Sequence, residues 1–423
     1  MLIEAHVGNF RSFAEEQQFS LLKGTGNELL DTNVFEAEFA HGHKPMTLLR
    51  SAAIYGANAS GKSNWLKALA VMQRIVMTSA SRQLGDPLPV SPFLFDAKLE
   101  KQPSLFEVTV IAEGVRYQYG FTCNKEAIVE EWLFAFPKGK PQRWFEREGN
   151  TYEFGDFFKG EKDLWSRATR SNALFLSTAI QLNSSQLQPL FKWFSDTLRF
   201  AGVEGWTPVN TAEKCLSGLK DQVIEFLKAA DFSIEDIIVK KKPFDVGELP
   251  KEMPQEVRTI LEYQLKDKEG MQLSTRHRSR QGKLVDLSFA EESDGTQKMF
   301  SFAGPWLDSL KQGRVLFLDE LHDNLHPALV RYLVGLFHDS KTNPHNAQLV
   351  FTTHDTSILS QEVFRRDQIW FCERDNDQAS HLYPLTDFSP RKGVENLERS
   401  YLSGRYGAIP FLRKEIVSGS FDG

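Results

Sequence analysis

Residues 56 to 63 read Gly-Ala-Asn-Ala-Ser-Gly-Lys-Ser, a complete G-x-x-x-x-G-K-[ST] loop of the kind that binds phosphate groups. Gly56 and Gly61 allow the backbone N–H groups to close tightly around the phosphates. Lys62 is placed to reach the β and γ phosphates, and the Ser63 hydroxyl is placed to ligate Mg²⁺. We expect a nucleotide to be bound by Gly56, Asn58, Ser60, Gly61, Lys62, Ser63 and Asn64.

The segments on either side of this loop are the ones that a phosphate site requires. The apolar run Leu48–Tyr55 predicts a buried strand before the loop, and Ser63–Ile75 has the periodicity of a helix after it. A helix that begins at the loop directs its N-terminal dipole at the bound anion. A glycine turn that merely enters an ordinary helix is the alternative, and this context argues against it.

A pair of carboxylates follows a second apolar run. The run Arg314–Leu318 predicts a buried parallel strand, and Asp319 and Glu320 come at its carboxyl end. Beside a phosphate loop, Asp319 would hold Mg²⁺ through water, and Glu320 would polarise the attacking water as a general base. A purely structural role for these acids, as caps of the helix after His326 and Pro327, is the alternative.

Two further segments have polar residues where an element begins or ends. The apolar run Gln348–Thr353 ends at His354, which could sense the γ-phosphate. Ser293 and Asp294 are natural helix caps, and Gly295 allows a close backbone approach. This second helix N-terminus could therefore also receive an anion.

These residues must be positioned by an α/β fold. We expect a mixed central sheet, an antiparallel β-subdomain formed by a meander over about 87–160, and a mainly helical insertion. The corresponding division is an N-terminal lobe at 1–204, the insertion at 205–282 and a C-terminal lobe at 283–423. Further expected elements are strands at Leu2–Val7 and Asn172–Ile180, helices at Leu187–Phe200, Leu216–Ala230 and Pro254–Leu265, and a charged connection at Lys240–Pro243.

The composition is that of an ordinary soluble protein, with 423 residues of which 41% are hydrophobic and 25% charged. No window is apolar enough for a membrane span, and the first twenty residues lack the pattern of a signal peptide, so we expect a cytoplasmic protein without membrane contact. The three cysteines are far apart in the sequence, which supports neither a disulfide framework nor a zinc site. The net charge of −6 argues against a surface devoted to nucleic acid, although a local basic face remains compatible with it.

Several smaller motifs keep two interpretations. The basic run Arg276–Lys283 is either a solvated loop or a contact for phosphate or a partner. Arg11 either touches the nucleotide or forms a surface salt bridge. Glu373–Asp377 is better explained as a polar hairpin turn than as a metal site. His322 and His326 have the i,i+4 spacing of zinc ligands but no third ligand is apparent.

Taken together, these motifs resemble the ATP-binding cassette superfamily, and within it the soluble SMC-like and OLD-like ATPases. Gly56–Ser63 resembles Walker A, Leu316–Glu320 Walker B, Glu292–Gln297 a degenerate signature, Asn324–Pro327 the D-loop and His354 the switch histidine. The resemblance implies ATP and Mg²⁺ as cofactors. Gln181 stands where a Q-loop glutamine would contact nucleotide and Mg²⁺, with a surface glutamine that starts a helix as the alternative.

Two longer segments are similar to the RloA/AbiL-type ATPases of bacterial phage-defence loci, namely 53–64 and 404–410. This similarity implies a homodimer or higher oligomer with composite ATP sites, in which Ser293 and Gly295 of one subunit close on the phosphate held by Lys62 of another. It also implies slow or regulated turnover and a separately encoded effector, commonly a Toprim-type nuclease, because few residues follow His354. The signature carries Glu292, Asp294 and Thr296 at positions that usually hold other residues.

Two other functions compete with this interpretation. One is a DNA-repair ATPase of SMC or RecF type that clamps DNA, which would make nucleic acid a partner. The other is the motor subunit of a transporter, for which the insertion before the signature and the C-terminal extension are not expected.

Overall fold

The computed structural model describes residues 1–40, 45–201, 206–243, 255 and 269–410. The chain divides into two compact units. Unit 1 comprises Met1–Val203, Leu310–Asp323 and Val330–Gly423, and unit 2 comprises Glu204–Ser309 and Asn324–Leu329. No helix in the described ranges is both long and apolar enough to cross a membrane.

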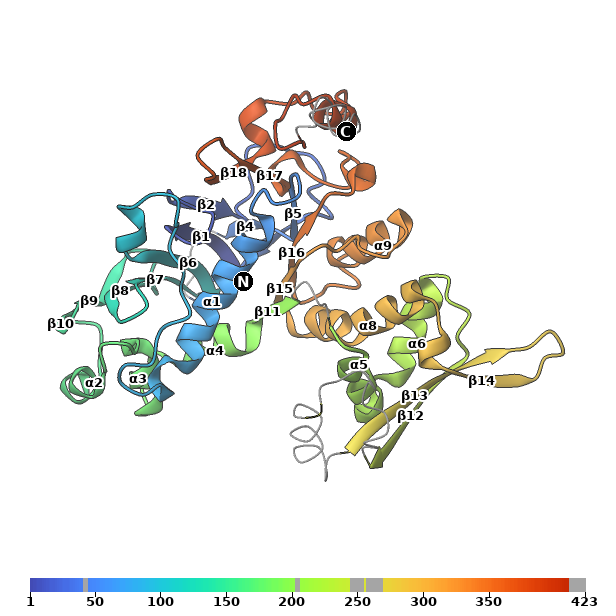
Figure 1. Ribbon diagram of the computed structural model, residues 1–423, viewed down its shortest axis with the longest axis horizontal. Helices are drawn as coiled ribbons and strands as arrows, with labels where there is room; N and C mark the ends of the chain where they lie inside the picture. The colour runs from blue at the N-terminus through green and yellow to red at the C-terminus, as the bar shows by residue number, and fades with distance from the viewer. Residues whose placement is uncertain (41–44, 202–205, 244–254, 256–268, 411–423) are drawn as a thin grey trace, which may run out of the picture. The chain divides into compact units, whose positions relative to one another are not determined.

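Unit 1 contains an antiparallel sheet with the strand order β10-β9-β8-β7-β6-β1-β2 (Figure 1). Consecutive strands from β6 to β10 pair antiparallel, which confirms the predicted meander. Alternating burial along β6 and β8 follows the two-residue period of a sheet with one covered face. The strands are β1 (Leu2–Gly8), β2 (Gln17–Ser20), β6 (Ser104–Ala112), β7 (Val115–Cys123), β8 (Ile128–Phe136), β9 (Gln142–Glu148) and β10 (Thr151–Phe154).

The second sheet of unit 1 has the order β11-β15-β16-β5-β17-β18. All neighbouring pairs are parallel except β17 with β18. Strands β15, β16 and β5 are buried along their whole length, as expected for a covered parallel sheet. The strands are β5 (Ser51–Tyr55), β11 (Leu198–Ala201), β15 (Val315–Leu318), β16 (Gln348–Thr353), β17 (Ile369–Arg374) and β18 (Ser380–Pro384); β3 (Val34–Ala37) and β4 (Met46–Leu49) form a separate pair.

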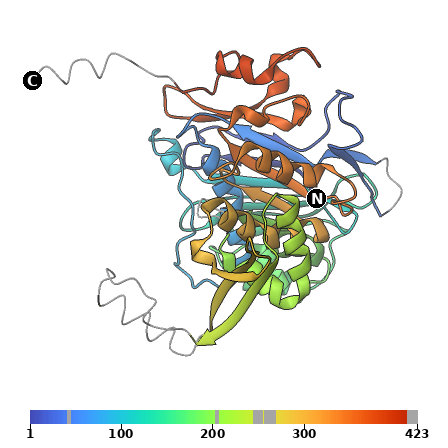
Figure 2. The ribbon, with the colours of Figure 1, turned by 90° about the vertical axis from the view of Figure 1, so that its right-hand side faces the viewer.

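Helix α1 (Lys62–Thr78) joins the two sheets into one hydrophobic core. Its buried face includes Trp65, whose ring packs edge-on against Phe13 at 5.8 Å between centroids. The same core contains residues of β6 and β16. The remaining helices that lie wholly in unit 1 are α2 (Lys162–Ala168), α3 (Phe175–Gln181), α4 (Gln188–Lys192) and α10 (Leu397–Leu402). In Figures 1 and 2, α10 lies beside the β17–β18 hairpin, where Tyr401 stacks on Phe371 at 5.4 Å.

The described part of unit 2 combines helices with a three-stranded sheet of order β12-β13-β14. Its elements are α5 (Pro208–Lys214), α6 (Lys220–Ala229), β12 (Asp236–Pro243), β13 (Glu269–Arg278) and β14 (Leu284–Ser288). Two helices run across the unit boundary, α8 (Asp294–Gln312) and α9 (Pro327–His338). The insertion was expected to be mainly helical, and the described residues add this sheet to it.

Three local predictions are wrong. Asn172–Ile180 is not a strand, because α3 occupies Phe175–Gln181. The helix expected over Leu187–Phe200 ends before Leu198, where β11 begins. Lys240–Pro243 is not a connection but the end of β12, paired with β13. The helix predicted at Pro254–Leu265 lies outside the described residues, apart from Gln255.

The physical reason for α3 is a contact from a distant strand. The carboxylate of Glu131 in β8 accepts hydrogen bonds from the N–H groups of Phe175 and Leu176, at 2.6 and 3.0 Å. These N–H groups lie at the helix N-terminus, where no carbonyl of the helix itself can satisfy them. A buried acid more than forty residues away therefore stabilises this helix.

Candidate nucleotide-binding site

The phosphate loop runs between the end of β5 and the start of α1. A β-carbon added to Gly56 would lie 2.3 Å from the carbonyl oxygen of Cys372, so no larger residue fits there. Gly61 has a φ of 113°, and a β-carbon on it would lie 2.3 Å from the Ser380 hydroxyl oxygen. The glycines thus serve the close packing of the loop against β17 and β18 as well as its curvature.

Lys62 is only 6% exposed, although it carries a charge. Its ammonium group donates to the carbonyl oxygens of Gly56 at 2.7 Å and Ala57 at 2.9 Å. Burial lowers the pKa of Lys62 below its ordinary value, while the negative charges of Asp319 and Glu320 act in the opposite direction. A bound phosphate would supply negative charge next to the ammonium group and so offset the cost of burying this cation. The environment of Lys62 is therefore suited to binding an anion.

The two acids and the histidine come to the same edge of the sheet as the loop. Strands β15, β16 and β5 are adjacent and parallel, with Leu318 in register with Phe351 and Phe351 in register with Ala53. The residues that follow each strand therefore meet at one edge, which is where ligands bind in open α/β sheets. This topology brings Asp319, Glu320 and His354 toward the loop.

Thr352 connects the two acids, and the sequence reasoning missed it. The Thr352 hydroxyl donates to Oδ1 of Asp319 at 2.6 Å and accepts from the N–H group of Glu320 at 2.8 Å. Glu320 has a φ of 53°, a left-handed conformation that is uncommon outside glycine. In the sequence, the hydroxyl-bearing residue two positions before His354 was the feature that could have indicated this contact.

His354 has a partner that the zinc hypothesis did not foresee. Nε2 of His354 lies 3.0 Å from Nε2 of His322, and Nδ1 of His322 lies 3.0 Å from the Thr353 hydroxyl. His326 instead accepts a hydrogen bond from the N–H group of Ala328 at the start of α9. Within the described ranges, no group of three metal-ligating side chains is found.

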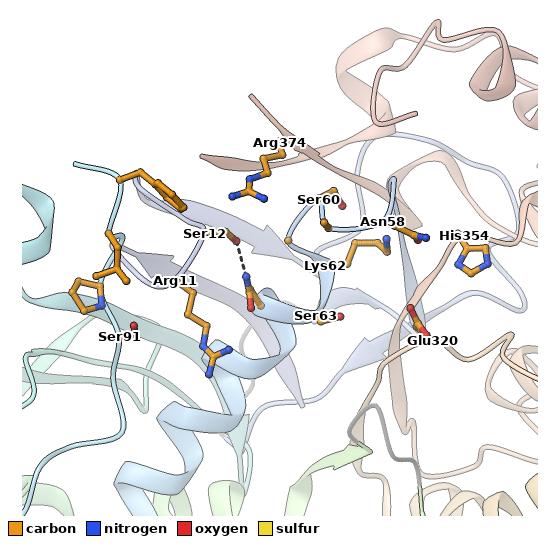
Figure 3. Close-up of a pocket in the computed structure, with 16 residues that line it drawn as sticks. Arg11, Ser12, Asn58, Ser60, Lys62, Ser63, Ser91, Glu320, His354 and Arg374 are labelled. Carbon is orange, nitrogen blue, oxygen red and sulfur yellow. Dashed lines mark hydrogen bonds between the residues drawn. The ribbon is translucent and has the colours of Figure 1, made fainter. Parts of the chain in front are cut away.

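A pocket of about 720 Å³ collects most of the predicted residues. Figure 3 shows Glu320 and His354 at one end of it, the phosphate loop in the middle, and Arg11 and Ser91 at the other end. The Asn64 amide donates to the Ser12 hydroxyl at 2.9 Å beside the loop. The lining residues are Arg11, Ser12, Asn58, Ala59, Ser60, Gly61, Lys62, Ser63, Asn64, Ser91, Pro92, Leu94, Phe95, Glu320, His354 and Arg374.

Other predicted residues lie apart from this lining. Asp319 is buried beside Glu320, and the structure does not bring Gln181 to the pocket, since this exposed residue ends α3. Ser293 and Gly295 belong to unit 2. There the Ser293 hydroxyl accepts from the N–H group of Thr296 at 3.2 Å and so caps α8.

The residues present fit a nucleoside triphosphate with Mg²⁺. The Ser60 hydroxyl is buried and has no hydrogen-bond partner among the described residues. It lies on the loop that would surround phosphates, next to a buried cation. Ser63 and Asp319 offer the oxygen ligands that Mg²⁺ prefers, and such sites normally keep several water ligands. The fold and this pocket define the class of protein: an α/β protein with a phosphate-loop nucleotide site.

The chain belongs to the family described as "AAA domain, putative AbiEii toxin, Type IV TA system", whose model matches residues 51–360. The match includes the phosphate loop, both acids and His354. No curated protein matches the chain.

Two solved structures with low similarity are SMC head domains. The chain is 13% identical to the SMC head domain from Thermotoga maritima, with a TM-score of 0.40, covering 90% of this chain and 98% of that one. It is 12% identical to an SMC head bound to the C-winged helix domain of ScpA, with a TM-score of 0.39 and coverages of 90% and 96%. The family therefore follows from the family model and not from these structures.

Proposed function

We propose that this protein hydrolyses ATP at the pocket in unit 1. The observation that carries the proposal is the meeting of Lys62, Glu320 and His354 around one loop. The loop N–H groups and Lys62 would bind the phosphates, and Ser63 and Asp319 would hold Mg²⁺, which would neutralise charge on the phosphates. Glu320 would take the proton of the attacking water, and His354 would contact the γ-phosphate.

We further propose that hydrolysis is slow and is coupled to assembly. In the arrangement implied by the sequence resemblance, Ser293 and Gly295 of one subunit complete the site of another, so that ATP stabilises a dimer or larger oligomer. ATP binding would then favour the closed state by the difference in its affinity for the two states. Hydrolysis would end that preference.

The function that this cycle would serve is control of a separate effector in a cytoplasmic anti-phage system. The family description, which refers to a toxin–antitoxin system, supports a role in defence. A Toprim-type nuclease is the effector that the resemblance to RloA/AbiL-type ATPases favours. This choice of effector is made by analogy between folds.

The test is a purification of the tagged Glu320→Gln variant, expressed from its native operon, with ATP. This variant should bind ATP without hydrolysing it and so retain its partners. A stoichiometric protein encoded nearby, released when ATP is removed, would support the proposal. The matched control is Glu362→Gln, an exposed glutamate of unit 1 outside the pocket. Recovery of a bare dimer, or of DNA alone, would refute effector control.

The second candidate function, a DNA clamp, is favoured by the basic run at the β13–β14 hairpin. Arg276 pairs with Asp286 and Arg278 pairs with Glu235, which accounts for two of its charges. Arg280 and Lys283 have no ionic partner among the described residues. In Figure 1 this hairpin extends beyond the helices of its own unit.

The clamp predicts that duplex DNA stimulates the ATPase in a salt-sensitive manner. Replacing Arg280 and Lys283 together by Gln should lower the slope of log affinity against log salt by about two. Replacing Lys138 and Lys140, at the turn between β8 and β9, removes the same charge elsewhere and serves as the control. Equal slopes in the two double variants would count against the clamp.

A further inference from the structure

The pocket continues well past the phosphate loop, on the side opposite Glu320 and His354 (Figure 3). The far part is formed by the segment 91–95 and by Arg374 at the end of β17. Two large apolar side chains are exposed there, Leu94 at 60% and Phe95 at 65%. Single exposed apolar residues are common on proteins, but two that line the same concave site indicate a ligand with an apolar surface.

The backbone of this segment is held in place by the N-terminal loop. The N–H group of Phe93 donates to Oδ1 of Asn9 at 3.0 Å, and the N–H group of Arg11 donates to the carbonyl oxygen of Ser91 at 2.8 Å. Phe93 itself is buried and packs edge-on against Phe95 at 5.6 Å. The exposed ring of Phe95 is thus presented by a fixed backbone, which reduces the entropy lost when a ligand binds.

Arg374 lies over the same aromatic ring. Its guanidinium carbon is 5.8 Å from the centroid of Phe95, and its Nε donates to the carbonyl oxygen of Gln378 at 3.1 Å. A planar heterocycle stacks well on both a phenyl ring and a guanidinium group. A flat ring needs about 3.5 Å on each face, so a small movement of the Arg374 side chain would admit one.

We propose that Phe95, Leu94 and Arg374 form the subsite for the base of the nucleotide, with the base stacked on Phe95. The triphosphate would then lie along the loop from Ser60 to Ser63 and present its γ-phosphate to Glu320 at the other end. This inference rests on the proposed function, because it assumes that a nucleotide occupies the pocket. It adds that the segment 91–95 supplies affinity for the base.

The test separates the base from the phosphates by comparing ATP with inorganic tripolyphosphate, each with Mg²⁺, by titration calorimetry. Phe95→Ala should weaken ATP binding about tenfold, because it removes the aromatic ring on which the base stacks. Tripolyphosphate binding should not change. Phe95→Tyr keeps an aromatic ring and should bind ATP as the wild type does.

A matched control is Phe157→Ala, which removes a phenylalanine that is 60% exposed in the same unit but outside the pocket. This control variant should bind both ATP and tripolyphosphate with the wild-type affinity. Wild-type ATP affinity in Phe95→Ala, or an equal loss for ATP and tripolyphosphate, would overturn the base subsite. Undiminished binding of both ligands by Lys62→Ala would instead overturn the proposed function, so the two failures can be told apart.

Discussion

Replacing Thr352 by valine should damage both stability and catalysis, because its hydroxyl holds the two acids of the site together. Thr352 is fully buried, donates to the Asp319 carboxylate and accepts from the N–H group of Glu320. Valine has nearly the same shape but can make neither bond. The substitution therefore leaves the N–H group of the half-buried Glu320 without this acceptor, and the buried carboxylate of Asp319 without one of its donors.

The expected loss of stability follows from the two groups that lose a hydrogen bond, the carboxylate of Asp319 and the N–H group of Glu320. A hydrogen bond to a charged group contributes about 1.5–3 kcal/mol, and a buried N–H group left without a partner costs about 1–3 kcal/mol. Because the two bonds share one hydroxyl, the effects will not simply add. We expect a loss of about 3 kcal/mol in the free energy of unfolding. Loss of a group that orients a metal ligand typically weakens metal affinity or activity about 10–100-fold, so more Mg²⁺ should be needed for half-maximal ATPase activity.

Urea denaturation and a Mg²⁺ titration of the ATPase rate measure the two effects. The control is Thr178→Val, since Thr178 is also buried but its hydroxyl donates only to the carbonyl oxygen of Leu174. That variant should lose about 1 kcal/mol at most and keep the wild-type Mg²⁺ dependence. If both variants unfold at the same urea concentration and respond alike to Mg²⁺, Thr352 does not position the acids.

Three further predictions concern other parts of the chain. Ser293→Arg should leave ATP binding intact while abolishing turnover, measured by calorimetry and phosphate release; undiminished turnover would argue against composite sites. Burial lowers the pKa of His338 from 6.5 to about 3. As the pH falls from 6.5 toward 3, the imidazole is therefore protonated in the unfolded chain but stays neutral in the folded chain. This group should cost about 1.4 kcal/mol of stability per pH unit in that window, and His338→Gln should unfold with a correspondingly weaker acid dependence in urea titrations. The thiols Cys123, Cys215 and Cys372 are buried, and burial raises the pKa of each. They should react with a thiol reagent at pH 8 only after denaturation, and rapid labelling of the native protein would contradict this.

Much of the site could be predicted because its chemistry lies in short, contiguous segments. The glycines, Lys62 and Ser63 lie within eight residues, between a strand and a helix that are each evident from local pattern. Apolar runs that end in polar residues likewise indicated β15 and β16. Since the ends of parallel strands share an edge, their meeting with the phosphate loop could be anticipated from the order of elements.

Other elements were ambiguous in the sequence for an identifiable reason. The segment 172–180 is mostly apolar and is buried from 172 to 179, so its periodicity cannot distinguish a buried strand from a buried helix. Its helix begins where Glu131 satisfies the first N–H groups, a contact between residues far apart in the chain. The lysines of β12 suggested a loop, yet pairing with β13 overrode that local preference.

The sequence by itself determined the class of the protein, its phosphate loop and the acids that face it, because each depends on residues close together in the chain. Only the tertiary structure decided which distant side chains complete the site. Thr352 reaches Asp319 across neighbouring strands, and Arg374 lies over Phe95 although nearly three hundred positions separate them. No local pattern encodes such contacts, since packing brings these residues together only when the sheets close on their common core.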